Sequence, residues 1–345
     1  MLATTAERIA LQTTYPFTIA RETVHEIENV VVRIADAEGC EGVGGAAPSR
    51  RYGETVDTVM AVLPELLDVV TSVGDPNALQ RIERGMHAVV RGHAAAKMAI
   101  SAALHDLRAQ QAGLPLYRFW GLDATAALTS SFTIGIDSTE RMIEKTQEAV
   151  AAGYPTLKIK LGTARDREII DAVRTHAPDA TLRVDANEAW TPREAVAMIE
   201  VLADYDVEFV EQPLPAEHHE ALKFVYDRSV LPIALDESCV TLSDIPRIAD
   251  RADIANLKLM KCATLQEAHR MVHTARAHGL EVMLGCMIES NASIAAAAHL
   301  APLLDYADLD GSLLLDDDPY EGVHLTGGHI DLKTADRAGT GARGR

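Results

Sequence analysis

Leu182-Arg183-Val184-Asp185 is the first of three short apolar runs that each end in an acidic residue, followed by Phe209-Val210-Glu211 and Ile233-Ala234-Leu235-Asp236. The acids are 26 residues (185 to 211) and 25 residues (211 to 236) apart, which is the length of one strand, one helix and two loops. This spacing predicts consecutive βα units of a barrel, whose parallel strands converge at their C-terminal ends. Three carboxylates meeting there would repel one another without a hard cation, so the pattern indicates an oxygen-ligated Mg²⁺ site.

From Ser130 onward, strand-like and helix-like segments alternate strictly. Eight strands within about 180 residues (132 to 309) predict a barrel, although an open doubly wound sheet is compatible with the pattern alone. The expected strands cover residues 132–136, 156–161, 182–184, 207–210, 233–235, 254–259, 282–285 and 306–309.

The first 125 residues follow a different pattern. A meander is expected over Ile27–Ile34 and the glycine-rich 39–45, and helices over 55–73 and 77–113. Strands followed by helices without alternation predict an α+β domain. We expect it to span residues 1–125 and to be joined by the C-terminal residues 320–345, with strands at 323–325 and 330–332 and a frayed end from Gly339. The barrel is then 126–319.

Bulk composition excludes several function classes. The net charge is −19, which disfavours nucleic acid or an anionic membrane as a partner. No apolar run is long enough to span a membrane, and no secretory signal is apparent. The four cysteines (Cys40, Cys239, Cys262, Cys286) show no CxxC spacing, so free thiols and a cytoplasmic location are expected.

Lysines flank the three acids on neighbouring strands. Lys158 and Lys160 lie two residues apart and point to the same face of their strand, and Lys258 lies one strand beyond Asp236. A lysine can act as a base near neutral pH only if its pKa is lowered from about 10.4. A nearby Mg²⁺ and a second ammonium group both act in that direction.

These motifs together resemble the successive active-site strands of the enolase superfamily, most closely its muconate-lactonizing-enzyme subgroup. The resemblance covers essentially the whole chain and implies a (β/α)7β modified TIM barrel with an N-terminal α+β capping domain. Asp308-Leu309-Asp310 resembles the DxD signature of dipeptide epimerases of the Ala-Glu epimerase type. The segments that carry the resemblance are 156–160, 184–187, 210–214, 235–238, 256–261 and 308–310.

The resemblance implies a Mg²⁺-dependent epimerase that inverts the α-carbon of the C-terminal residue of an L,L-dipeptide. It makes Asp185, Glu211 and Asp236 the metal ligands, Lys160 and Lys258 the two catalytic bases, and Lys158 an electrostatic partner that contacts the substrate carboxylate. Two bases on opposite faces of a planar enediolate allow a proton to be removed from one side and returned on the other. Lys261 resembles a second lysine without a catalytic role.

Substrate-binding residues are also implied. Asp308 and Asp310 face the same side of the last strand, and a carboxylate pair suits the free α-amino group of a dipeptide. Thr133, Met287 and Glu289 correspond to family positions near the substrate, and a mobile loop around Arg21 and Glu22 and a second loop around Tyr52 correspond to the segments that close over it.

The loops leave the side-chain preference open. The Ala-Glu epimerases have an arginine where this chain has Glu22, with Arg21 adjacent. A glutamate would repel an acidic side chain and favours another, even cationic, C-terminal residue. Arg50 and Arg51 in the second loop instead favour an acidic side chain on the substrate.

Two alternatives to a dipeptide epimerase remain at this stage. The first is another enzyme of the same subgroup: a cycloisomerase, an o-succinylbenzoate synthase or an N-succinylamino acid racemase. The Asp308/Asp310 pair disfavours it. The second is a barrel without catalytic activity that binds or assembles. Homo-oligomers are common in the superfamily, so a homo-oligomer is among the expected forms.

Overall fold

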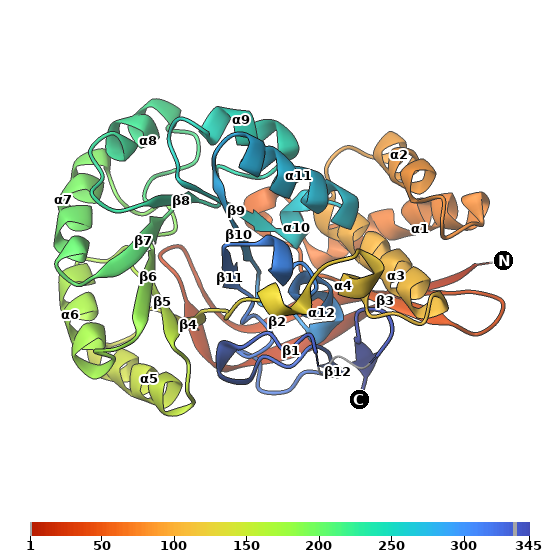
Figure 1. Ribbon diagram of the computed structural model, residues 1–345, viewed down its shortest axis with the longest axis horizontal. Coiled ribbons are helices and arrows are strands. Elements are labelled where there is room, and N and C mark those ends of the chain that lie inside the picture. The colour runs from red at the N-terminus through yellow and green to blue at the C-terminus, as the bar shows by residue number, and fades with distance from the viewer. Residues whose placement is uncertain (1, 334–336) are drawn as a thin grey trace.

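A computed structural model describes residues 2–333 and 337–345 of the chain. The N-terminal part forms a three-stranded antiparallel sheet that packs against helices (Figure 1). Its strands are β1 (Ala3–Thr18), β2 (Thr23–Ala35) and β3 (Glu41–Ala46). The helices that follow are α1 (Val56–Val73), α2 (Leu79–Val89), α3 (Ala94–Gln111) and the short α4 (Leu116–Phe119).

The second part is a barrel of eight strands that run parallel in sequence order from β4 to β11. A bridge between Ser130, two residues before β4, and Ala307 of β11 links the two ends of this sheet and closes the ring. The (β/α)7β barrel with its N-terminal cap is therefore confirmed. The strands are β4 (Phe132–Ile134), β5 (Thr156–Lys160), β6 (Thr181–Asp185), β7 (Val207–Glu211), β8 (Ile233–Leu235), β9 (Ile254–Lys258), β10 (Glu281–Gly285) and β11 (Tyr306–Asp308).

Helices cover the outside of this barrel, visible as the outer ring in Figure 1. These helices bury an apolar face against the strands, which explains why strand-like and helix-like segments alternate in the sequence. The helices are α5 (Thr139–Ala151), α6 (Asp166–His176), α7 (Pro192–Ala203), α8 (His219–Tyr226), α9 (Ile245–Ile248), α10 (Leu259–Cys262), α11 (Leu265–Ala277) and α12 (Asn291–Ala298).

Two glycines let the cap sheet lie directly on helix α3. A Cβ on Gly42 would sit 2.0 Å from the carbonyl oxygen of Ala103, and one on Gly44 would sit 2.1 Å from that of Ala99. No side chain fits at these distances, so the sequence Glu41–Ala46 is glycine-rich because of packing. Helix α3 is buried along nearly its whole length between this sheet and neighbouring elements.

The C-terminal segment returns to the cap, but not in the form expected from the sequence. Residues 323–325 and 330–332 are not strands; the short strands are β12 (Tyr320–Glu321) and β13 (Arg343–Gly344), which pair with each other. The expected fraying from Gly339 is also wrong. Thr340 is buried, and its backbone N–H and hydroxyl both donate to Asp106 Oδ1, at 2.5 and 3.0 Å.

Strand β1 was not foreseen from the sequence. Its residues alternate between exposed and half-buried along most of the strand. The strand forms because twelve pairs of residues align with β2 across the hairpin. The domain boundary expected near residue 125 stays a prediction. Among the described residues, no helix is long and apolar enough to cross a membrane.

Candidate active site

The three predicted metal-binding acids meet at the C-terminal mouth of the barrel. Asp185 ends β6, Glu211 ends β7 and is paired with Asp185 in register, and Asp236 directly follows β8. All three side chains are essentially inaccessible to solvent. Three buried acids on adjacent strands confirm the arrangement expected from the spacing, and they require compensating positive charge.

Two lysines of β5 supply part of that charge. The Nζ of Lys158 lies 3.1 Å from Asp185 Oδ2 and 2.8 Å from Glu211 Oε2, so one ammonium group bridges two acids. The Nζ of Lys160 lies 2.7 Å from Asp185 Oδ2. The remaining oxygen of Glu211 accepts a hydrogen bond of 2.8 Å from the amide of Asn256.

Two lysines on the opposite wall contact Asp236. Lys258 Nζ lies 2.8 Å from Asp236 Oδ2. Lys261 Nζ is fully buried and donates to Asp236 Oδ1, to the Asp236 carbonyl and to the Asn256 carbonyl, at 2.5, 2.7 and 3.0 Å. An ammonium group has three hydrogens. All three hydrogens of Lys261 are thus used by the Asp236 carboxylate and two backbone carbonyls, which favours Lys258 as the group that can reach a substrate.

The charges in this cluster shift one another's pKa values. Burial opposes ionisation of Asp185 and Asp236, but their lysine partners outweigh it and lower both carboxyl pKa values. Burial also disfavours the charged forms of Lys158 and Lys258, and the facing carboxylates again outweigh it and raise both pKa values well above the usual range. The protein residues alone therefore do not give the lowered lysine pKa that a base near neutral pH needs.

The donor chemistry of the cluster fits a hard divalent cation. Within the described residues, no group of three or more His, Cys, Asp or Glu side chains is arranged so that it could hold a metal as it stands. In this structure the ammonium group of Lys158 bridges Asp185 and Glu211. Three buried carboxylates offer only oxygen donors and match the preference of Mg²⁺, so Asp185, Glu211 and Asp236 are the residues that would hold such an ion.

Asp308 and Asp310 stand at the end of the last strand, beside this cluster. Asp308 Oδ2 lies 2.8 Å from Lys158 Nζ, and its Oδ1 accepts a 2.7 Å hydrogen bond from Ser131. Asp310 Oδ2 accepts a 2.6 Å hydrogen bond from the backbone N–H of Thr133. Burial and the negative charge of Asp308 raise the pKa of Asp310 to about 7. Asp308 thus has a cationic partner in Lys158, whereas Asp310 is held by a backbone N–H.

Two loops of the cap reach the barrel mouth through arginines. Arg21 Nη1 lies 2.9 Å from Glu188 Oε2, and Arg21 Nη2 lies 2.9 Å from Glu237 Oε1. Arg51, in the second loop, contacts both oxygens of Glu188. Glu188 adopts a left-handed backbone conformation with φ 70°, which is uncommon outside glycine and is typical of functional sites.

Tyr52 reaches the same region. Its pKa is raised by burial and by the charge of Asp236, and Lys258 opposes this shift, so the phenol lies within the field of both groups. Burial, followed by the neighbouring charges of Asp236 and Asp185, raises the pKa of Glu237 to about 7. The predicted loop residues Arg21 and Tyr52 are therefore both brought to the site.

The remaining predicted residues are placed differently. Glu22 is exposed to solvent, while its neighbour Arg21 turns toward the barrel. Glu289 is buried and held within its own turn, since its carboxylate accepts hydrogen bonds from Met287 N–H and the Ser293 hydroxyl, at 2.8 and 2.5 Å. Thr133 is buried next to Asp310, and Met287 packs against the core.

Two family models match the chain. One, described as "Mandelate racemase / muconate lactonizing enzyme, N-terminal domain", matches residues 3–121. The other, "Enolase C-terminal domain-like", matches residues 141–343 and so covers most of the barrel. The chain belongs to the enolase superfamily. Within it, the first model assigns the chain to the mandelate racemase/muconate lactonizing enzyme group.

Curated members of this superfamily align along nearly the whole chain. The hydrophobic dipeptide epimerase of Roseobacter litoralis is 38% identical over 345 residues, covering 96% of each protein. The L-Ala-D/L-Glu epimerase of Bacteroides thetaiotaomicron is 37% identical over 323 residues, covering 93% of this chain and 83% of the relative. These relatives differ in the dipeptides their names give.

A solved superfamily structure has nearly the same fold. A dipeptide epimerase from Enterococcus faecalis, complexed with Mg and the dipeptide L-Leu-L-Tyr, superposes with a TM-score of 0.92 at 34% identity and covers 98% of each chain. The L-Ala-D/L-Glu epimerase from Bacillus subtilis, in a substrate-liganded complex, gives 0.93 at 32% identity, covering 99% of this chain and 98% of that one.

Three residues of the site were not found from the sequence. Glu188 and Glu237 lie four and two residues beyond the expected strands 182–184 and 233–235, and only the fold shows that two loop arginines reach them. Asn256 lies inside a strand and orients Glu211. The one signal in the sequence was that these three residues lie close to Asp185, Asp236 and Lys258.

Proposed function

We propose that this enzyme is a Mg²⁺-dependent dipeptide epimerase that inverts the α-carbon of the C-terminal residue by proton transfer between two lysines. One observation carries the proposal. Lys160 ends β5 and Lys258 ends β9, and these strands lie four places apart in a ring of eight, on opposite walls. Inversion requires removal of a proton from one face and delivery to the other, and opposite walls supply both faces.

The residues around the two lysines have distinct tasks. Asp185, Glu211 and Asp236 would hold the metal ion, and Lys158 would pair with the substrate carboxylate. Lys160 takes or gives the α-proton on one face and Lys258 on the other. When bound, Mg²⁺ supplies charge that lowers the pKa of nearby ammonium groups and offsets the negative charge developing on the substrate carboxylate.

Asp308 and Asp310 select a substrate with a free amino terminus. Both are buried, and together they carry more negative charge than the single contact with Lys158 balances. A dipeptide ammonium group completes the charge balance, whereas an N-acylated substrate leaves the pair uncompensated. This disfavours the N-succinylamino acid racemases among the alternatives, although one such enzyme from Bacillus cereus shares the fold with a TM-score of 0.91 at 24% identity.

The test is incubation in D2O with Mg²⁺ and a library of L,L-dipeptides. Mass spectrometry should find one deuterium in the product, located at the α-carbon of the C-terminal residue, and chiral chromatography should identify the L,D form. A library without any deuterium uptake contradicts the proposal. A cytoplasmic location, the lack of a nucleic-acid partner and a homo-oligomeric state stay predictions.

A further inference from the structure

Gln212 follows Glu211 directly at the end of β7 and has an unusual backbone conformation. Its φ is 37°, in the left-handed region that residues other than glycine rarely adopt. Its side chain is fully buried. Such conformations persist only where surrounding contacts hold them, and they are concentrated at functional sites. The contacts of Gln212 reach the turns that follow the other two acids, Asp185 and Asp236.

The main chain of Gln212 makes one more bond with β8 and then turns away from it. Its N–H donates to the Ala234 carbonyl at 2.9 Å. In a regular parallel ladder, its own carbonyl would next accept the N–H of Asp236. That carbonyl instead accepts the N–H of Glu188, at 2.9 Å. Asp236 is thus separated from the main-chain partner that a regular ladder would have given it.

The side-chain amide of Gln212 takes the place of that partner. Its Oε1 accepts the N–H of Asp236 at 3.0 Å and that of Ser238 at 3.2 Å. Its Nε2 donates to the Leu214 carbonyl at 2.8 Å and to the Ser238 hydroxyl at 2.9 Å. A carboxamide offers two donor hydrogens and two acceptor positions, so all four are used. Rotating or shifting the amide would break several of these bonds at once.

Asp236 therefore depends on side chains for both of its main-chain groups. Its N–H is held by Gln212, and its carbonyl accepts a 2.7 Å hydrogen bond from Lys261 Nζ. Asp236 lies one residue beyond the end of β8. Because Gln212 is covalently joined to Glu211, its amide links the main chains of two of the three acids.

We propose that Gln212 is a positioning residue of the metal site. Its side-chain amide fixes the main chain of Asp236 relative to Glu211, so that both carboxylates are held ready for one divalent cation. The inference rests on the proposed function, because it takes these acids as metal ligands, and it adds a residue outside the ligand set. Groups that orient metal ligands typically contribute about 10- to 100-fold to metal affinity.

The experiment measures cation binding without turnover. Mn²⁺ is the probe, since carboxylate oxygens suit it as they suit Mg²⁺, and the EPR signal of free Mn²⁺ gives its Kd. Gln212→Met keeps a side chain of similar length without the amide. Gln212→Gly removes the side chain and also relieves the strain at φ 37°. Both lose the amide, so both should raise the Kd of Mn²⁺ by about 10-fold or more.

Amide hydrogen exchange in the metal-free protein locates the effect. Exchange should become faster at residues 236 and 238 in both variants, because these N–H groups lose their acceptor. Exchange at Glu188 should change much less, because its acceptor is the main-chain carbonyl of residue 212, which both variants retain. A general loosening of the barrel would speed up all three amides together.

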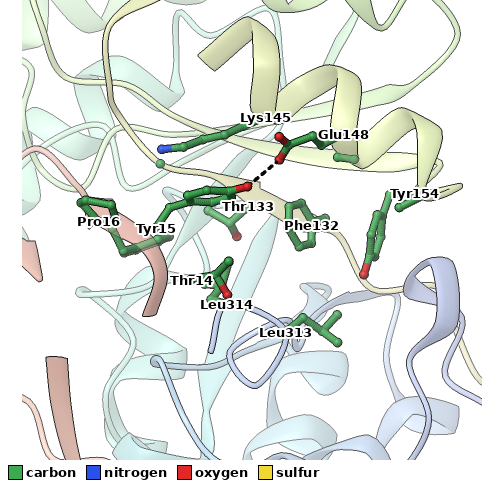
Figure 2. A pocket seen from close by; sticks show the side chains of 14 residues that line it. Thr14, Tyr15, Pro16, Phe132, Thr133, Lys145, Glu148, Tyr154, Leu313 and Leu314 are labelled. Atoms are coloured by element: carbon green, nitrogen blue, oxygen red, sulfur yellow. Dashed lines mark hydrogen bonds between the residues drawn. The ribbon is translucent and has the colours of Figure 1, made fainter. Parts of the chain in front are cut away.

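Another part of the barrel offers a stability control. A cavity of about 270 Å³ lies between β4, α5 and the end of β1, and Figure 2 shows Phe132 and Leu314 on its walls. Gln212 and the three acids are not among the residues that line it. Leu314→Ala enlarges this cavity and should lower Tm, yet it should leave the Kd of Mn²⁺ unchanged. Lower stability is thereby distinguished from lower metal affinity.

Different results would overturn the metal ligands and the role of Gln212. If the parent enzyme does not bind Mn²⁺, or Asp236→Asn binds it as tightly as the parent, the assigned ligands fail and the proposed function fails with them. If the parent binds Mn²⁺ and both Gln212 variants bind it equally well, or Leu314→Ala weakens binding as much as they do, the function stands and the role of Gln212 is wrong. Should Gln212→Met not fold, Gln212→Gly decides, since the space left by the side chain admits water to the freed N–H groups.

Discussion

Arg51 and Glu188 form a bidentate ion pair across the interface between cap and barrel. Arg51 Nε lies 2.9 Å from Glu188 Oε2 and Nη2 lies 2.7 Å from Oε1. Paired contacts of this geometry fix orientation as well as distance. Because Arg21 contacts the same carboxylate, both cap loops are held over the site by one side chain.

Glu188→Gln should loosen both loops. The amide keeps the shape of the side chain but removes its charge, so we expect KM to rise about 10-fold with a smaller change in kcat. Amide hydrogen exchange should become faster in residues 19–23 and 50–53. Glu217→Gln is the control, since Glu217 is largely exposed and contacts only one nitrogen of Arg51. Unchanged exchange in Glu188→Gln would show that the loops close by other means.

Lys160→Ala and Lys258→Ala should each abolish epimerisation, by a factor of about 10³ or more, because each removes one of two bases. Each variant should retain exchange of the α-proton from one epimer only, and the two variants should retain opposite epimers, measured by NMR in D2O. Lys261→Ala should instead reduce stability, because Lys261 holds two backbone carbonyls. An active Lys258→Ala enzyme with an inactive, folded Lys261→Ala enzyme would reverse the assignment.

Asp310→Asn should reduce kcat/KM for dipeptides about 100-fold, since the variant loses a charged partner of the ammonium group. An N-acetylated dipeptide is the informative comparison. It should be a poor substrate for the parent enzyme, and Asp310→Asn should not weaken it further. Equal losses for the free and the acetylated dipeptide would indicate that Asp310 acts by positioning Thr133, to which it is hydrogen-bonded.

Mg²⁺ should stabilise the folded protein independently of activity. A ligand that binds only the native state at 100 times its Kd adds about 2.7 kcal/mol. We expect Tm to rise with Mg²⁺ and to fall back when EDTA is added, measured by calorimetry. Asp236→Asn should lose this rise. A Tm that is insensitive to Mg²⁺ in the parent enzyme would contradict the assigned ligands.

Acid should destabilise the protein through His299. Its Nδ1 accepts the Tyr117 N–H at 3.2 Å and its Nε2 donates to the Thr340 carbonyl at 3.0 Å, so the buried ring is neutral. Burial lowers its pKa from 6.5 to about 4. The unfolded chain therefore binds a proton first, and stability is lost as pH falls from 6.5 toward 4, by about 1.4 kcal/mol per pH unit.

Urea unfolding at several pH values measures this slope. His105 and His269, whose pKa values burial also lowers to about 4, add to it. His299→Gln should flatten the slope by about one proton while keeping a side chain that can both donate and accept. An unchanged slope would show that His299 titrates normally in the folded state.

The barrel and its acids were predictable because period and spacing are local properties of the sequence. The positions of Asp185, Glu211 and Asp236 at the mouth could be predicted from strand ends alone, and the resemblance added the roles of the lysines. The ion pairs of Glu188 with Arg51 and Arg21 were not predictable, because these arginines lie 137 and 167 residues away in the sequence and are brought close only by the fold. Strand β1 was missed for a similar reason, since its stability comes from pairing with β2.

The C-terminal segment shows the same limit. Its glycines and charges predict a frayed end, yet Thr340 is buried because Asp106, 234 residues earlier, needs hydrogen-bond donors. A buried carboxylate on an apolar helix is a weak sequence signal, and nothing in the local composition near Thr340 identifies its partner.

That link between Asp106 and Thr340 has a consequence for synthesis. The cap is encoded first, and domains generally begin to fold as they emerge from the ribosome. The carboxylate at Asp106 nevertheless stays without two of its donors until residue 340 has been translated and has cleared the exit tunnel. A nascent chain stalled after the last barrel strand thus carries an incompletely anchored cap, and the anchoring of the cap waits for the synthesis of residue 340.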